Sequence, residues 1–225
     1  MASPYYDKRG VFYNRLGISD ARQLQRAEYV MAGARAVQLL LGQVALPPDW
    51  GAERLRAIHR HLFQDVYEWA GAWRSAPASK RMAGSMVSVF AMPQELASRV
   101  CDVEQRVQDF LLHGAADFKQ KCRTLADIFI AANHIHPFPE GNGRSLQIFI
   151  THLAAAAGIA LDWRRVQAAE WNRASAISGV YGILFEGNQL VPEPPDRAPI
   201  REIFARMAAE VSEKPLQGVS ARRQA

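Results

Sequence analysis

Apolar residues recur at intervals of three and four over most of this chain, which is the spacing of amphipathic helices. The clearest example runs from Leu96 to Leu111, where apolar residues alternate at steps of four and three. The same spacing predicts further helices over residues 20–41, 49–62, 124–135, 146–153, 163–177 and 200–211. We therefore predict an all-α fold, a helical bundle.

Polar residues that precede the apolar runs predict where helices start. Ser19 or Asp20 is expected to cap the first helix, and Thr124 the helix that ends near residue 135. The helix from Leu146 to Leu153 is apolar almost all round, so we place it at the centre of the bundle. The expected buried face of the first helix comprises Leu24, Ala27, Met31, Ala34, Val37 and Leu41.

One segment, from Ser75 to Ala91, breaks the helical pattern. It contains Gly84 and a short alternation of apolar and polar residues from Met86 to Phe90. This pattern predicts a β-hairpin. The hairpin is either a surface feature without a role or a flap that holds the extended segment of another protein by strand addition, and we favour the flap.

The chain has 225 residues, enough for one large domain or for one domain with an arm. Four prolines between Pro192 and Pro199 form a connector before the last helix. We predict a domain with an N-terminal helical lead-in over residues 1–190, a connector and helix over residues 191–214, and a disordered tail over residues 215–225.

Composition and charge narrow the class of protein. Apolar residues make up 49% of the chain and charged residues 22%, an ordinary globular balance. The net charge is +5, but no dense block of Lys and Arg occurs apart from Arg222-Arg223. We therefore expect a phosphorylated substrate or an acidic protein as the partner, and no direct binding of nucleic acid.

The two cysteines and the apolar runs bear on the compartment. Cys101 and Cys122 form no CxxC pair, which favours a reducing setting over a disulfide framework or a zinc site. The first nine residues lack the apolar core of a signal peptide. The apolar stretch from Leu153 to Leu161 is too short to span a bilayer. We expect a cytoplasmic protein that makes no membrane contact.

Nine residues from His136 to Arg144 read His-Pro-Phe-Pro-Glu-Gly-Asn-Gly-Arg. They lie between two predicted helices, and their prolines oppose helix, so we expect a tight loop that ends on the N-terminus of the second helix. Gly141 and Gly143 allow positive φ and let backbone amides approach a ligand closely. Amides in such a loop, together with the helix N-terminus, form a site for an anion such as phosphate.

The side chains of this loop supply the other parts of a phosphoryl or nucleotidyl transfer site. His136 can take up a proton near neutral pH. Glu140 offers a hard oxygen ligand for Mg²⁺, which usually binds through one or two carboxylates plus substrate phosphates. Arg144 offers a fork of donors suited to phosphate.

Each of these residues also has a purely structural interpretation. His136 alone would most often satisfy a buried turn and Glu140 would be a solvated loop charge, but their combination within nine residues favours a site. Phe138 is expected to anchor the loop to the core. His134 and His136 suggest a metal pair, yet residues two apart do not share a helix face and no third ligand stands nearby in sequence. We therefore interpret His134 as structural.

The segment from His136 to Arg144 resembles the HxFx(D/E)GNGR signature of the Fic family, whose members transfer AMP or related phosphate-containing groups to protein hydroxyls. Six or seven constrained positions make this a specific match. The resemblance covers roughly residues 14–190 and implies the Fic fold, a helical bundle with a short β-hairpin flap. It extends to the lead-in Asn14–Glu28, to Phe63–Arg74 before the flap, and to the flap ends Ser79-Lys80 and Phe90-Ala91.

The resemblance implies a protein adenylyltransferase that moves AMP from ATP, with Mg²⁺, to a Tyr, Thr or Ser hydroxyl of a target protein. His136 would be the general base and Arg144 a second catalytic residue. Glu140 would hold the Mg²⁺, and the target would dock at the flap, residues 79–91. The implied nucleotide-binding residues are Glu140, Gly141, Asn142, Gly143, Arg144 and Gln147.

Gln147 departs from the family pattern, which usually continues as GNGRxxR with a second arginine on the terminal phosphate of ATP. The hydrogen bonds of a neutral amide to phosphate are weaker than those of a cation. Two alternatives therefore stay beside AMP transfer from ATP: a transferase of the same fold with another phosphate-containing donor, and a non-catalytic nucleotide-binding module.

Many Fic proteins are inhibited by a helix with the pattern (S/T)xxxE(G/N). Here Glu precedes Gly or Asn only at Glu140 and Glu186, and the residues four positions earlier are His136 and Gly182. The pattern is therefore absent. Either a small antitoxin-like protein supplies it, or this chain is not controlled in that way. Some family members are effectors delivered into a host cell, which is the alternative to a cytoplasmic site of action.

Overall fold

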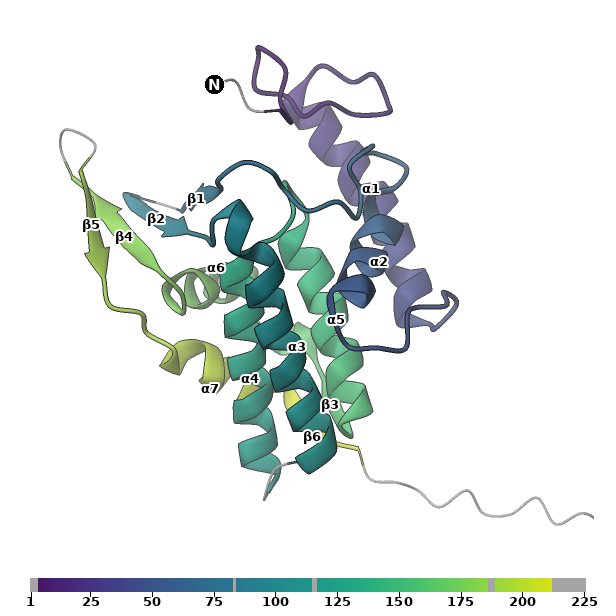
Figure 1. Ribbon diagram of the computed structural model, residues 1–225, viewed down its shortest axis with the longest axis vertical. Helices are drawn as coiled ribbons and strands as arrows, with labels where there is room; N and C mark the ends of the chain where they lie inside the picture. The colour runs from purple at the N-terminus through teal and green to yellow at the C-terminus, as the bar shows by residue number, and fades with distance from the viewer. Residues whose placement is uncertain (1–3, 83, 115–116, 186–188, 212–225) are drawn as a thin grey trace, which may run out of the picture.

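The computed structural model describes residues 4–82, 84–114, 117–185 and 189–211. Helices form most of it, as the apolar spacing predicts. Figure 1 shows α3, α4 and α5 packed side by side, with α1 and α2 on one flank and α6 and α7 on the other. The helices are α1 Ala21–Leu40, α2 Ala52–Phe63, α3 Leu96–His113, α4 Phe118–Ile135, α5 Asn142–Ala156, α6 Ala168–Ile177 and α7 Ala198–Met207.

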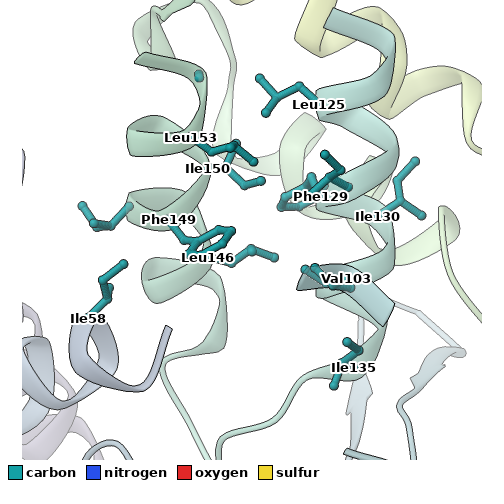
Figure 2. Close-up of a cluster of buried hydrophobic side chains, with 14 of the residues drawn as sticks. Ile58, Val103, Leu125, Phe129, Ile130, Ile135, Leu146, Phe149, Ile150 and Leu153 are labelled. Carbon is teal, nitrogen blue, oxygen red and sulfur yellow. The ribbon is translucent and has the colours of Figure 1, made fainter. Parts of the chain in front are cut away.

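The core lies between α4 and α5. Figure 2 shows Leu125 and Phe129 of α4 pointing toward Ile150 and Leu153 of α5. Ile150 and Leu153 have no exposed surface, so the prediction that this helix occupies the centre of the bundle is confirmed. Helix α4 also contacts α3 and α7, and α5 contacts α1 and α2. The loop that joins α4 to α5 is therefore attached at both ends to helices of the buried core.

The predicted hairpin is present as strands β1, Ser79–Arg81, and β2, Met86–Val89. A second hairpin, β4, Tyr181–Leu184, and β5, Leu190–Glu193, extends it to a four-stranded antiparallel sheet of order β1-β2-β4-β5. Two short strands, β3, Ile159–Leu161, and β6, Ala208–Glu210, pair elsewhere. The all-α prediction with one hairpin is thus corrected to a mostly helical fold with two small sheets. Pro192 is tolerated in β5 because that strand lies at the edge of its sheet.

Several predicted helix ends are also corrected. Asp20 caps α1 by accepting a hydrogen bond from the Gln23 amide at 2.7 Å, as predicted. Thr124 does not cap α4, because the helix begins about two turns earlier, with Asp117 as its cap. The segment Trp163–Arg165 is a separate 3₁₀ turn. After α7 the chain turns extended and pairs with β3 as β6, so Val211 lies outside the helix and is 52% exposed.

The predicted buried face of α1 is only partly right, because Leu24 is buried and Met31 packs against the core, whereas Ala34, Val37 and Leu41 are exposed. The buried residues of this helix are Leu24, Glu28, Ala32 and Leu39. Val37 is instead 54% exposed. The sequence pattern pointed to another face because a charged residue, Glu28, occupies the buried stripe.

The C-terminal helix packs into the same core as the rest of the chain. Phe204 has no exposed surface and its ring lies 5.6 Å from that of Phe129 on α4. Arg201 and Asp127 form an ion pair at 2.8 Å across the same interface. The boundary at residue 190 stays a prediction, and the predicted tail, residues 215–225, lies outside the described residues. None of the described helices is long and apolar enough to cross a membrane.

Candidate active site

The loop between α4 and α5 has the predicted helix–loop–helix form. His136 ends α4 in the left-handed conformation, with φ 50° and ψ 59°. It is the one non-glycine residue with positive φ in the described part of the chain. Left-handed backbone is unfavourable for residues with a Cβ, so the surroundings must hold it there. The loop then returns to helix at Gly141, which precedes α5 with φ 79°.

The two loop glycines differ in what requires them. Gly141 has positive φ, and a Cβ there would lie 2.3 Å from Cε2 of Phe63. Gly143 lies inside α5 without positive φ, and a Cβ there would meet no atom within 4 Å. The prediction of positive φ is therefore confirmed for Gly141 and wrong for Gly143. Close approach of a ligand to Gly143 stays a prediction, and the residue lines the cavity described below.

The N-terminus of α5 presents free amides. Its first intrahelical bond runs from the Ser145 amide to the Gly141 carbonyl, at 3.0 Å. The amides of residues 142–144 precede that bond and have no partner within the helix. They carry the positive end of the helix dipole, which favours an anion at this position.

The His136 ring stacks on Phe90 with centroids 3.7 Å apart and planes 7° from parallel. Its Nδ1 is buried. Desolvation lowers the pKa of His136 to about 3, and the nearby positive charges of Lys80 and Arg74 lower it as well. A hydrogen bond with the backbone of Asn133 acts in the opposite direction and raises this pKa. The imidazole is therefore neutral at physiological pH and can accept a proton.

Arg74 braces the loop from the segment before the flap. It is 3% exposed, and its Nε donates to the His136 carbonyl at 2.8 Å. Its other guanidinium nitrogens donate to the carbonyls of Ala76, Ala91 and Ile135. This buried arginine uses backbone acceptors before the flap, at the second end of the flap and at the end of α4, and so holds the left-handed turn in place. No sequence pattern predicts this role, apart from the resemblance of Phe63–Arg74 to the Fic family.

His59 supports the loop from α2. It has no exposed surface, accepts a hydrogen bond at Nδ1 from the Gly71 amide at 2.8 Å, and bonds through Nε2 to the Glu140 carbonyl at 2.9 Å. Since Nδ1 accepts, Nε2 carries the proton and donates. Desolvation lowers the pKa of His59 to about 3, which keeps the ring neutral. It also stacks on Phe138, so the predicted anchoring of that phenylalanine in the core is confirmed.

The side chain of Asn142 is committed to the loop. Its Nδ2 donates to the Phe138 carbonyl at 2.7 Å and its Oδ1 accepts from the Phe138 amide at 2.8 Å. The residue is 7% exposed. Because its side chain holds the turn, a contact between Asn142 and a ligand would have to use the backbone amide of this residue.

Arg144 projects toward α1 and the end of α2. Its Nη2 donates to Oε1 of Glu28 at 2.5 Å and lies 3.5 Å from Oε1 of Glu140. Its guanidinium also lies over the rings of Phe63 and Tyr29, at 4.6 and 5.0 Å from their centroids. Arg144 thus connects the loop to the N-terminal helix.

A cavity of about 230 Å³ lies between the loop and the flap. It brings together four predicted site residues, His136, Glu140, Asn142 and Gly143. Arg144 and Glu140 face an adjoining cavity of about 340 Å³ on the α1 side. The first cavity also contains residues to which the sequence analysis assigned no chemistry: Lys80, Ser88, Phe90, Trp171 and Asn172.

Gln147 lies apart from this cavity. It is half-buried on α5 and lines an apolar cavity with Tyr29, Leu40 and Trp163, shared with Arg144. The described residues contain no group of three or more His, Cys, Asp or Glu side chains that could hold a metal ion. The structural role of His134 stays a prediction, and a cation at Glu140 would need oxygen ligands from a bound substrate.

The Fic/DOC family model matches residues 49–154, which contain α2, the flap, α3, α4 and most of α5. The chain is 33% identical over 212 residues to the "Probable protein adenylyltransferase Fic" of Salmonella typhimurium, and the match covers 93% of this chain and 94% of that protein. The chain belongs to the Fic/DOC family. The residues that the family model matches include the loop between α4 and α5 and the flap.

Two further relatives place the chain within the family. It is 36% identical to "Protein adenylyltransferase VbhT" of Bartonella schoenbuchensis over 80% of its own length, but it spans only 36% of that protein. The structure is similar to the N-terminal Fic domain of a putative cell filamentation protein from Bartonella quintana with bound ADP. That similarity has a TM-score of 0.75 at 25% identity and covers 92% of this chain and 94% of that one.

Proposed function

We propose that this Fic chain is a protein adenylyltransferase that transfers AMP from ATP to a hydroxyl group of a target protein. The observation that carries the proposal is the placement of a neutral, pre-positioned His136 beside Glu140 and the free amides of α5, in one cavity under the flap. The names of the Salmonella and Bartonella relatives and the ADP in the Bartonella quintana structure support it.

The chemistry assigns one step to His136. The target hydroxyl loses its proton to the imidazole as its oxygen bonds to the α-phosphorus of ATP. The bond from that phosphorus to the bridging oxygen breaks, and pyrophosphate leaves with the electron pair. Since Nδ1 is buried, we assign the proton uptake to Nε2.

The free amides of residues 142–144 would hold the phosphates, with the positive end of the helix dipole behind them. Lys80, on β1, lines the same cavity and adds a positive charge. Arg144 would bind phosphate from the adjoining cavity. Anions bound near His136 would oppose the depression of its pKa and so strengthen it as a base.

Glu140 fits the role of a magnesium ligand. Its side chain is 47% exposed, it faces both cavities, and one carboxylate with substrate phosphates is the usual protein contribution to a Mg²⁺ site. When bound, Mg²⁺ would neutralise charge on the phosphates. The Gly141 amide donates to the Glu140 carboxylate at 2.9 Å and fixes its orientation.

The target protein would dock along the flap, residues 79–91. Strand β1 has a single neighbour in the sheet, and all three of its residues are exposed, so its outer edge offers backbone groups to an added strand. Because β1 also carries Lys80, a segment added here would lie along the cavity that contains His136.

A small antitoxin-like inhibitor is a separate proposal. Such a partner would cover the exposed apolar residues Tyr29, Val30 and Leu40 of α1 and Leu41 just after it. Gln147 offers no cation for an inhibitory carboxylate, so the partner would act by covering the site. A cytoplasmic site of action, with delivery into a host cell as the alternative, also stays a proposal.

A donor other than ATP is the second candidate, and the neutral Gln147 is the observation that favours it. Transfer of label from ATP tagged on the α-phosphate, but not on the γ-phosphate, into a protein would support AMP transfer. Label from the γ-phosphate alone, or no label with ATP but transfer from another nucleotide, would reject it.

A further inference from the structure

Glu28 is a buried carboxylate on the N-terminal helix. It is 4% exposed, and its position in the apolar stripe of α1 requires that its charge be compensated. Two donors do so. Oε2 accepts from the Tyr67 hydroxyl, and Oε1 accepts from Nη2 of Arg144 at 2.5 Å.

Tyr67 keeps its proton in this arrangement. It is 1% exposed, and desolvation, with the nearby Glu28 carboxylate, raises its pKa well above the usual range. Its hydroxyl therefore acts as a donor to Glu28 throughout the physiological range. Its ring stacks on Trp69 at 4.2 Å, which fixes the direction of that hydroxyl.

Arg144 has two carboxylates within reach of the same nitrogen. Nη2 lies 2.5 Å from Glu28 and 3.5 Å from Glu140. Glu28 is buried and doubly bonded, whereas Glu140 is about half exposed. The stronger of the two interactions is therefore the one with Glu28, because desolvated charge-assisted hydrogen bonds exceed exposed ion pairs.

We propose that Glu28, fixed by Tyr67, is a positioning residue that takes the shorter hydrogen bond from Arg144, limits the Arg144–Glu140 pair to the longer 3.5 Å contact, and so keeps the Glu140 carboxylate available to a divalent cation. The proposal rests on the proposed function, since it assigns Glu140 to the cation of a bound nucleotide. Without Glu28, Arg144 would turn to Glu140, its remaining acid neighbour among the described residues, and the cation would have to compete with a guanidinium.

The alternative is that Glu28 only joins α1 to α5. A purely structural ion pair would affect stability but not the dependence on cation concentration. The chain offers a matched control: Arg35 of α1 pairs with Asp65, just after α2, at 2.8 Å. This pair also ties α1 to the rest of the protein, but neither residue lines the cavities that contain Glu140.

The test measures binding of the ATP analogue AMPPNP by calorimetry over a series of Mg²⁺ concentrations. For Glu28→Gln, which keeps the shape and an acceptor, we expect the Mg²⁺ concentration for half-maximal binding to rise roughly tenfold, the size of one charge-assisted hydrogen bond. Tyr67→Phe should raise it by a smaller factor, and Asp65→Asn should leave it unchanged.

A second readout needs no nucleotide. Modification of Arg144 by a dicarbonyl reagent, mapped by mass spectrometry, should be faster in Glu28→Gln than in the wild type, and unchanged in Asp65→Asn. Equal Mg²⁺ dependence in the wild type and Glu28→Gln, or a lower requirement in the variant, would overturn the proposal. If the wild type bound no AMPPNP, both the proposed function and the cation role of Glu140 would fail. Unchanged reactivity of Arg144 in Glu28→Gln would separately refute the positioning of Arg144 by Glu28.

Discussion

His136 and Gly141 have positive φ at the two ends of the active-site loop, for different reasons. The His136 backbone is held by Arg74, which donates to its carbonyl, and its ring is held by Phe90. Gly141 has no room for a side chain, because the ring of Phe63 lies where a Cβ would be. At the scale of single residues, the site is therefore determined as much by contacts that hold the loop as by its reactive groups.

The depressed pKa of His136 predicts the pH dependence of transfer. A group with a lowered pKa stays neutral to lower pH, so kcat/KM should be nearly constant from pH 7.5 down to about 5 and fall only toward the pKa of about 3. Initial rates of AMP transfer in buffers across this range, with folding checked at each pH, would measure it. A half-maximal rate near pH 6.5 would show that the free enzyme has an ordinary histidine.

The two loop glycines give a matched pair of substitutions. Gly141→Ala should destabilise the fold by roughly 2–4 kcal/mol, because it adds left-handed strain and a clash with Phe63. Gly143→Ala should leave the free energy of unfolding unchanged or raise it, since the position is helical and open. It should nevertheless weaken nucleotide binding, because the added methyl group projects into the space near the free amides. Denaturant unfolding and calorimetry with AMPPNP measure both effects; equal stabilities of the two variants would contradict this account of the loop.

At the scale of elements, α5 shows what the sequence predicts well and what it does not. Its apolar spacing predicted a central helix, and the motif before it predicted a loop that ends at its N-terminus; both are confirmed. The strands β4 and β5 were missed because they are short and one contains Pro192. The supports of the loop, Arg74 and His59, were missed because their partners are backbone groups far away in sequence, which only the fold brings near.

The prediction for α5 concerns Gln147 and its effect on the binding of ATP. Gln147→Arg would place a cation one turn after Arg144, at the position where the family pattern has its second arginine. We expect tighter binding of ATP by roughly 1–2 kcal/mol, the difference between a charged and a neutral hydrogen bond to phosphate. Calorimetry with Mg²⁺ and AMPPNP measures it, and Gln147→Met serves as the uncharged control. Unchanged or weaker binding in the arginine variant would favour a different donor.

At the scale of the whole molecule, the fold brings three separate segments to one place. The α4–α5 core supports the loop, the flap covers it from one side, and α1 reaches it from the other through Glu28. The family and the loop could be predicted from nine residues. The contribution of α1 could not, because a buried glutamate in an apolar stripe is visible only when its partners, Tyr67 and Arg144, are in contact with it.

The most direct test of the central claim is intact-mass analysis of target proteins after incubation with Mg²⁺ and ATP, for the wild type and for His136→Ala. The wild type should add the mass of one AMP to a target, and the folded variant should do so at a rate lower by about 10²- to 10⁴-fold, the usual contribution of a general base. Addition of phosphate instead of AMP, or equal rates for the two proteins, would contradict the central claim.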